Sequence, residues 1–121
     1  MRNIRQILII AYVLFIIYYT ILNRAQGAEQ IFKPLFWEVS RGAWRDISLN
    51  ILLFVPLGLL MGCWKGIIFG FTLSVFIEIT QLVLCLGFCE MDDILNNTIG
   101  TVIGVGIYMG FYRLLSITRN K

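Results

Sequence analysis

One acidic residue lies in the middle of a long apolar stretch of this chain. Glu78 is the only charged residue between Gly66 and Cys89. A carboxylate at bilayer depth costs roughly 2.5 kcal/mol or more on insertion scales, so such groups usually face a protein interior or a water-filled cavity. Gln81 follows one helical turn later, and an acid-rich segment, 90–93, begins where the apolar stretch ends. These side chains could bind a cation or a cationic ligand, and we expect Glu78 to belong to a functional site.

Carboxylate and amide side chains recur at helical spacing on three segments. Residues three or four apart share one face of a helix. The three polar stripes are Asp46 and Asn50; Ser74, Glu78, Gln81 and Cys85; and Asp93, Asn96, Asn97, Gly100 and Gly104. Turned inward, they would line one polar pocket in the outer half of a small bundle. The plainer alternatives are that the amides only join neighbouring helices, at about 0.6 kcal/mol each, and that the aspartates only complement a helix N-terminus.

The elements that must position these groups are membrane-spanning helices. Hydrophobic residues make up 59% of the 121 residues and charged residues 14%, with a mean hydropathy of +0.83, whereas an average soluble domain is about a quarter charged. A span needs about 17 to 25 mostly apolar residues, and four segments qualify: Gln6–Asn23, Ile47–Trp64, Gly66–Cys89 and Ile94–Tyr112. We predict an all-α, polytopic membrane protein, a bundle of four transmembrane helices in a single domain over residues 1–121. A cleaved signal peptide is the alternative for the first segment, but its apolar run is longer than the usual core.

The distribution of basic residues predicts the orientation, because short cytoplasmic loops are enriched in Lys and Arg. Six lie on the side of the two tails and four on the opposite side: Arg2, Arg5, Lys65, Arg113, Arg119 and Lys121 against Arg24, Lys33, Arg41 and Arg45. This bias favours cytoplasmic termini, with the loop 24–46 and the acidic turn outside. The aromatic residues of that loop are typical of an interfacial connector. Alternatively, Arg41 and Arg45 grip a phosphate or carboxylate.

Glycine spacing predicts close helix contacts. Gly58, Gly62, Gly66 and Gly70 recur every four residues, and Gly100 with Gly104 and Gly106 with Gly110 form two further pairs. Such spacing lets helix backbones approach closely, within the bundle or between the subunits of a homodimer. Pro56 lacks a backbone donor and is expected to kink its helix.

Several kinds of chemistry are excluded by composition. The chain has no His, and its three cysteines show no Cys-x-x-Cys spacing, so neither a zinc site nor a redox site is predicted. No phosphate-binding Gly-rich loop is present, and no nucleic-acid-binding module fits so apolar a chain. We therefore predict no cofactor, no catalytic residue and no metal ligand.

Three ordered motifs resemble those of the VanZ-like family. They are Arg45-Asp46-x-x-x-Asn50 continuing to Phe54-x-Pro56-x-Gly58, then Ser74-x-x-x-Glu78-x-x-Gln81, then Asp92-Asp93-x-x-Asn96-Asn97-x-x-Gly100. The resemblance implies a small multi-pass bacterial membrane protein associated with low-level teicoplanin resistance, with neither an established activity nor an established ligand. Carried over by position, the family's motif residues are Asp46, Asn50, Phe54, Pro56, Gly58, Glu78, Gln81, Asp92, Asp93, Asn97 and Gly100.

We predict that an outer-facing acidic and amide-rich pocket engages a lipid-linked cell-wall precursor, another envelope lipid or a glycopeptide antibiotic at the bacterial cell membrane. Arg45 would attract an anionic headgroup, while Asp92 and Asp93 would bind a cation or a cationic group. The predicted pocket residues are Arg45, Asp46, Asn50, Glu78, Gln81, Asp92, Asp93, Asn96 and Asn97, with Phe54, Pro56, Gly58 and Gly100 as structural motif residues.

Two other interpretations stay open. One is a membrane enzyme acting on a lipid-linked substrate, with Glu78 or Asp93 as general base or with Mg²⁺ held by the aspartates. The other is a non-catalytic partner of a membrane complex, bound through the glycine faces.

Overall fold

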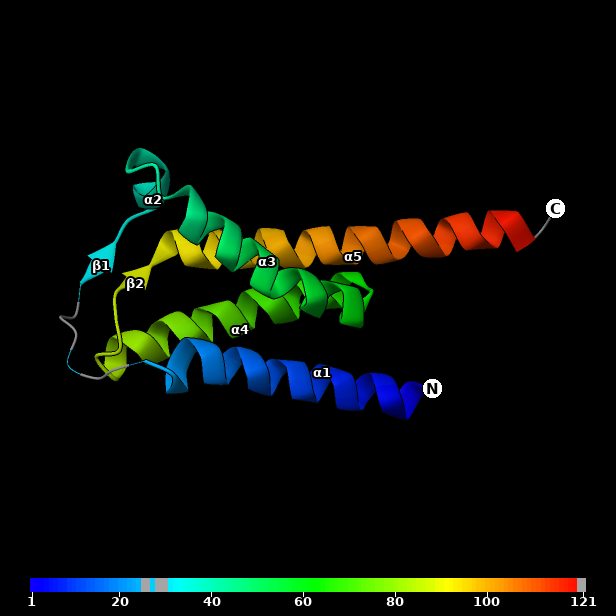
Figure 1. Cartoon of the computed structure of the whole chain (residues 1–121), viewed down its shortest axis with the longest axis horizontal. Coiled ribbons are helices and arrows are strands. Elements are labelled where there is room, and N and C mark those ends of the chain that lie inside the picture. The colour runs from blue at the N-terminus through cyan, green and yellow to red at the C-terminus, as the bar shows by residue number, and fades with distance from the viewer. Residues whose placement is uncertain (25–26, 28–30, 120–121) are drawn as a thin grey trace.

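The computed structural model is a bundle of four long helices with a small cap at one end (Figure 1). It describes residues 1–24, 27 and 31–119. Each of the four helices is long and apolar enough to cross a membrane, which confirms the predicted all-α, polytopic bundle. The spans are α1 (Arg2–Ile17) continued by the π-helical turn η1 (Tyr18–Leu22), α3 (Trp44–Met61), α4 (Trp64–Val83) and α5 (Met91–Arg119).

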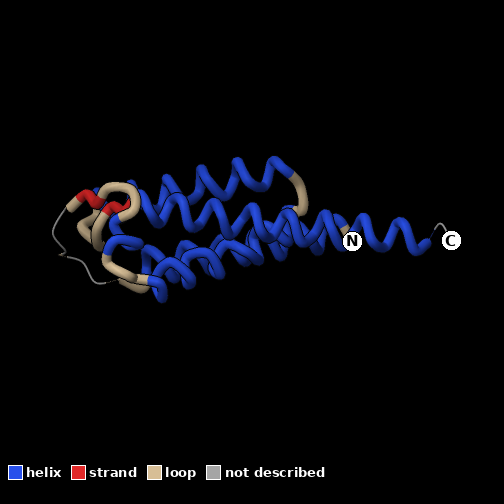
Figure 2. Tube along the Cα trace, turned by 90° about the horizontal axis from the view of Figure 1, so that it is seen from above, coloured by secondary structure: helices blue, strands red, loops and turns tan. Residues whose placement is uncertain are grey.

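The helix boundaries differ from those expected, most of all in α4 and α5. The helix α4 ends at Val83 rather than Cys89, because the chain turns through a left-handed residue, Cys85, with φ 52°. The helix α5 begins at Met91, so the aspartates lie in its first turn, where the helix dipole stabilises negative charge. With 29 residues, α5 is about 43 Å long at 1.5 Å per residue. Its C-terminal end extends beyond the other helices (Figures 1 and 2).

The loop between the first two spans folds back over one end of the bundle. We call residues 31–40 the strap. It contains β1 (Phe32–Lys33) and α2 (Trp37–Ser40). The strand β1 pairs in parallel with β2 (Cys89–Glu90), with Phe32 opposite Cys89 and Lys33 opposite Glu90. The strap is therefore joined to the α4–α5 connection. Residues 25, 26 and 28–30 of the predicted loop, like Lys121 of the basic set, lie outside the described residues.

Glycines set the close contact between α3 and α5. A Cβ added at Gly58 would lie 2.2 Å from the carbonyl oxygen of Thr101, and one at Gly100 would lie 2.2 Å from the carbonyl oxygen of Ile51. Both atoms belong to the facing backbone, so only glycine fits. Gly106 and Gly110 have no heavy atom within 4 Å of an added Cβ, so this pair makes no such contact within the described bundle.

The opposite end of the bundle is fastened by Arg5. Its Nε donates a hydrogen bond of 2.6 Å to the carbonyl oxygen of Leu60, its Nη2 donates to that of Met61, and its guanidinium lies over the Tyr108 ring. The charge thus sits at the C-terminus of α3, where the helix dipole favours a cation. The helix continues through Pro56 to Met61. The Tyr12 hydroxyl of α1 donates a 2.8 Å hydrogen bond to the nearby carbonyl oxygen of Leu53.

Candidate functional site

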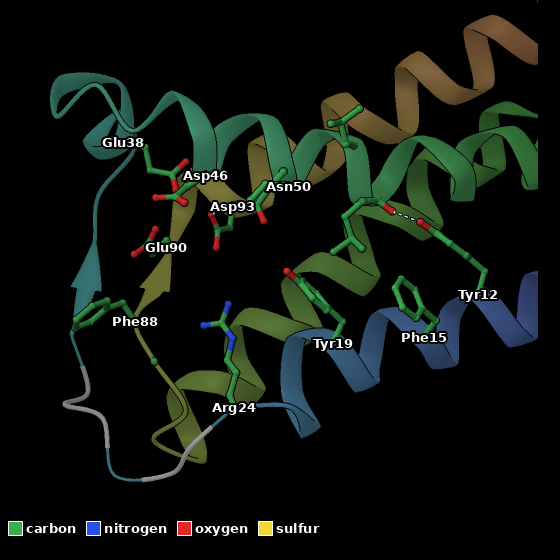
Figure 3. A pocket seen from close by; sticks show the side chains of 14 residues that line it. Tyr12, Phe15, Tyr19, Arg24, Glu38, Asp46, Asn50, Phe88, Glu90 and Asp93 are labelled. Atoms are coloured by element: carbon green, nitrogen blue, oxygen red, sulfur yellow. Dashed lines mark hydrogen bonds between the residues drawn. The ribbon is translucent and has the colours of Figure 1, made fainter.

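A cavity of about 620 Å³ lies under the strap, between α1, α3 and the start of α5 (Figure 3). Its polar residues gather near the strap, and its aromatic and aliphatic residues line the sides formed by α1 and α3. The lining consists of Tyr12, Phe15, Tyr19, Arg24, Glu38, Asp46, Leu49, Asn50, Leu52, Leu53, Gly87, Phe88, Glu90 and Asp93. The cavity is therefore amphipathic, with its acidic end at the cap.

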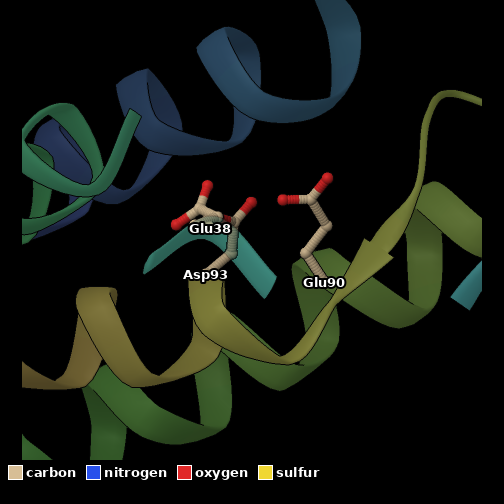
Figure 4. A group of neighbouring side chains, drawn as sticks. All are labelled: Glu38, Glu90 and Asp93. Carbon is tan, nitrogen blue, oxygen red and sulfur yellow. The ribbon is translucent and has the colours of Figure 1, made fainter. Parts of the chain in front are cut away.

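Three carboxylates from three different elements meet at the acidic end (Figure 4). One oxygen each from Glu38, Glu90 and Asp93 lies within 4.8 Å of the others. Each carboxylate is also held by a neighbour: the Asn96 side chain donates to Glu38 at 2.9 Å, and the Lys33 ammonium pairs with Glu90 at 2.6 Å. The Asn50 amide donates to Asp93 at 2.5 Å. The group is thus built by contacts between segments far apart in sequence.

The electrostatic environment of this group is strongly acidic. Glu38 is 5% exposed, and burial raises its pKa to about 7, helped by the nearby charges of Asp93 and Glu90. Figure 3 shows the Arg24 guanidinium pointing toward the carboxylates from the side of α1. Among the residues that line the cavity, four are acidic and Arg24 alone is basic. The cavity therefore favours protons, cations or cationic ligand groups.

The structure divides the predicted pocket residues between this cavity and the helix contacts behind it. Asp46, Asn50 and Asp93 line the cavity. Glu78 is 2% exposed and accepts a 3.0 Å hydrogen bond from the backbone N–H of Glu90. It thereby fixes the strand that carries the Glu90 carboxylate, and its own side chain lies outside the lining.

The deeper amides join helices. Gln81 donates a 2.9 Å hydrogen bond to the Thr20 carbonyl oxygen, and Asn97 donates one of 2.8 Å to Ser74 Oγ. These contacts tie α4 to η1 and to α5, which is the ordinary role of amides in membrane bundles. Both side-chain oxygens, Gln81 Oε1 and Asn97 Oδ1, are buried without a protein hydrogen-bond donor among the described residues.

Asp92 and Arg45 lie away from the cavity lining. The two Asp92 carboxylate oxygens accept hydrogen bonds from the backbone N–H groups of Phe36, at 2.5 Å, and Glu38, at 2.7 Å. Asp92 therefore caps the N-terminus of α2 and holds the strap on the bundle. Arg45 is exposed at the start of α3.

Comparison with known proteins gives the family. The model of the VanZ/LLP1 family matches residues 9–115. The chain belongs to the VanZ/LLP1 family. Among curated proteins, Protein VanZ of Enterococcus faecium is 30% identical over 74 residues, which cover 55% of this chain and 46% of that protein. The chain thus spans about half the length of the VanZ protein that it matches. No solved structure matches it.

Several lining residues of this VanZ-family cavity were not predicted as site residues from sequence. Glu38 and Arg24 come from the loop, Tyr12 and Phe15 come from α1, and Tyr19 comes from η1. The acid-rich segment 90–93 was a signal for Glu90. Glu38 had no comparable signal, because its partner Asn96 lies 58 residues further along the chain.

Carboxylate oxygens are suitable ligands for a hard divalent cation, so the group of three is the part of this VanZ-family chain that could hold one. A carboxyl with a pKa near neutrality is also suited to general base catalysis. Cysteine chemistry at Cys89 is disfavoured, because burial raises the pKa of its thiol and the nucleophile would be the thiolate.

Proposed function

We propose that this VanZ-family chain is a bacterial cell-membrane protein that contributes to teicoplanin resistance by binding an envelope lipid or the antibiotic in the cavity under the strap. The observation that carries the proposal is the cavity itself. It joins four carboxylates and one guanidinium at the cap to an aromatic wall on the membrane spans. A ligand with a charged part and an apolar part complements both ends.

The proposed orientation places the strap outside the cell and both termini in the cytoplasm. The described basic residues of the other end are Arg2, Arg5, Lys65, Arg113 and Arg119. Short segments rich in Lys and Arg are favoured on the cytoplasmic side. The cavity would then open where envelope precursors and glycopeptides meet the membrane.

The acids have two distinct roles in this proposal. Asp93 and Glu90 would contact the ligand, because both line the cavity. Glu78 would act as a positioning residue, since it holds the backbone N–H of Glu90. Arg24 lines the cavity and would attract an anionic headgroup. The sequence predicts that role for Arg45, which is exposed.

Teicoplanin susceptibility of a sensitive bacterial host tests the proposal. Asp93→Asn and Glu78→Gln are expected to lower the minimum inhibitory concentration to that of cells without the protein, with unchanged amounts in the membrane. Arg119→Gln, an exposed position at the opposite end, is the charge-changing control and should protect like the native chain. Full protection by correctly inserted Asp93→Asn would contradict the proposal.

One observation favours a second candidate, a membrane enzyme acting on a lipid-linked substrate. Glu38, with its pKa of about 7, is suited to accept a proton near neutral pH. Incubation of the purified protein with extracted envelope lipids distinguishes the two. New products that disappear with Glu38→Gln would favour the enzyme, whereas unchanged lipids would favour binding alone.

A further inference from the structure

One side of the cavity is lined by exposed residues of the spanning helices. Phe15 of α1 and Tyr19 of η1 are 49% and 51% exposed, and Leu52 of α3 is 63% exposed. These residues belong to spanning helices, so their exposed surfaces face lipid when the protein is inserted. An acyl chain can therefore lie between α1 and α3 while its head stays in the polar end.

The three carboxylates form a triangle of the right size for an ammonium group. Oxygens that lie within 4.8 Å of one another all lie within about 2.8 Å of the centre of their triangle, which is the length of a charge-assisted N–H···O hydrogen bond. A primary ammonium has three donors to offer. The Lys33 ammonium already makes a bond of this kind with Glu90, at 2.6 Å.

Charge balance also favours a cation. The acids Glu38, Asp46, Glu90 and Asp93 surround the polar end, against the bases Arg24 and Lys33. Two formal negative charges therefore have no basic counterpart among these residues. The Arg24 guanidinium points toward the acids from the side of α1 (Figure 3), in a position to fork a phosphate next to the ammonium.

Building on the proposed function, we infer that the cavity binds a membrane lipid whose head carries a phosphate and a primary ammonium. The ammonium lies among Glu38, Glu90 and Asp93, the phosphate lies on Arg24, and one chain leaves the cavity between α1 and α3. The ligand enters sideways from the bilayer and needs no passage through the strap.

Three synthetic lipids with identical dioleoyl chains test this inference. The purified full chain is incubated with phosphatidylethanolamine, phosphatidylcholine and phosphatidylglycerol in detergent, and retained lipid is counted by native mass spectrometry. Phosphatidylethanolamine is expected to be retained about tenfold more tightly than the other two, since losing one charged hydrogen bond costs about that factor. Phosphatidylcholine is the sharper comparison, because its head is cationic but has no N–H donor.

Variants separate the contacts with the two parts of the head. Asp93→Asn should reduce the preference for phosphatidylethanolamine to near unity. Arg24→Gln should weaken the binding of all three lipids while keeping the preference for phosphatidylethanolamine. Arg119→Gln should change neither the binding nor the preference. Helical circular dichroism checks that each variant is folded.

Equal retention of the three lipids by the native chain would overturn the inference, as would a preference that survives Asp93→Asn. A preference that requires added Mg²⁺ and is abolished by a chelator would also overturn it, in favour of a metal site. Equal retention together with teicoplanin protection that Asp93→Asn abolishes would leave the proposed function standing alone. A clear preference for phosphatidylethanolamine without any teicoplanin protection would support the lipid site and contradict the proposed function.

Discussion

Glu38 is the carboxyl outside the spans whose environment differs most from water. It is buried under the strap, accepts a hydrogen bond from Asn96, and has a pKa raised from 4.5 to about 7. The folded protein therefore binds a proton that the unfolded chain releases between about pH 4.5 and 7. This contribution to stability is complete below about pH 4.5 and is lost as the pH rises through about 7.

We predict that thermal unfolding in detergent shifts to lower temperature between pH 5.5 and pH 8. Over this pH range the loss attributable to Glu38 is at most about 2 kcal/mol, from 1.36 kcal/mol per pKa unit and a pKa raised from 4.5 to about 7. Thermal unfolding is followed by tryptophan fluorescence for the native chain and for Glu38→Gln. The difference between their pH dependences measures the contribution of Glu38, because the other acids titrate in both proteins. The variant should show the flatter pH dependence, and identical dependence in the two proteins would refute the assignment.

At the scale of elements, the α3–α5 contact depends on glycine. The Cβ of Gly100→Ala would lie 2.2 Å from the Ile51 carbonyl oxygen, so the helices must separate. We predict a loss of about 1–3 kcal/mol, as in other overpacked cores. Gly110→Ala is the matched control, because nothing lies within 4 Å of its Cβ. It should be neutral or slightly stabilising, since Ala has the higher helix propensity.

Unfolding of both variants in SDS, followed by circular dichroism, makes this comparison. If Gly110→Ala lost as much stability as Gly100→Ala, the prediction would be wrong, and a second copy packed on that face would explain the result.

The elements also show what could be predicted from sequence. The four spans follow from apolar length, and the contact at Gly58 and Gly100 follows from residue size. The strap could not be predicted, because its two-residue strand β1 pairs with β2, a segment far away in sequence, with Phe32 opposite Cys89. The cap that Asp92 forms on α2 could not be predicted either, since a carboxylate in sequence does not reveal which backbone N–H groups lie beside it.

On the scale of the whole molecule, charge is separated along the long axis. The described acids all lie toward the strap end of the bundle: Glu38, Asp46, Glu78, Glu90, Asp92 and Asp93. The opposite end carries basic residues, including Arg5 at the C-terminus of α3. An orientation with that end in the cytoplasm is expected from the positive-inside rule, and it would expose the acidic cavity to the cell envelope.

The chain carries its own probe of this orientation, because Cys63 is exposed in the α3–α4 connection. We predict that a membrane-impermeant maleimide labels Cys63 only after the cells are permeabilised. Ser40→Cys, at the end of α2 in the strap and exposed, should be labelled in intact cells once Cys63, Cys85 and Cys89 are replaced by Ser. Labelling of Cys63 in intact cells would show that the topology is the inverse of the one predicted. The cavity would then face the cytoplasm, and an extracellular antibiotic could not reach it without first crossing the membrane.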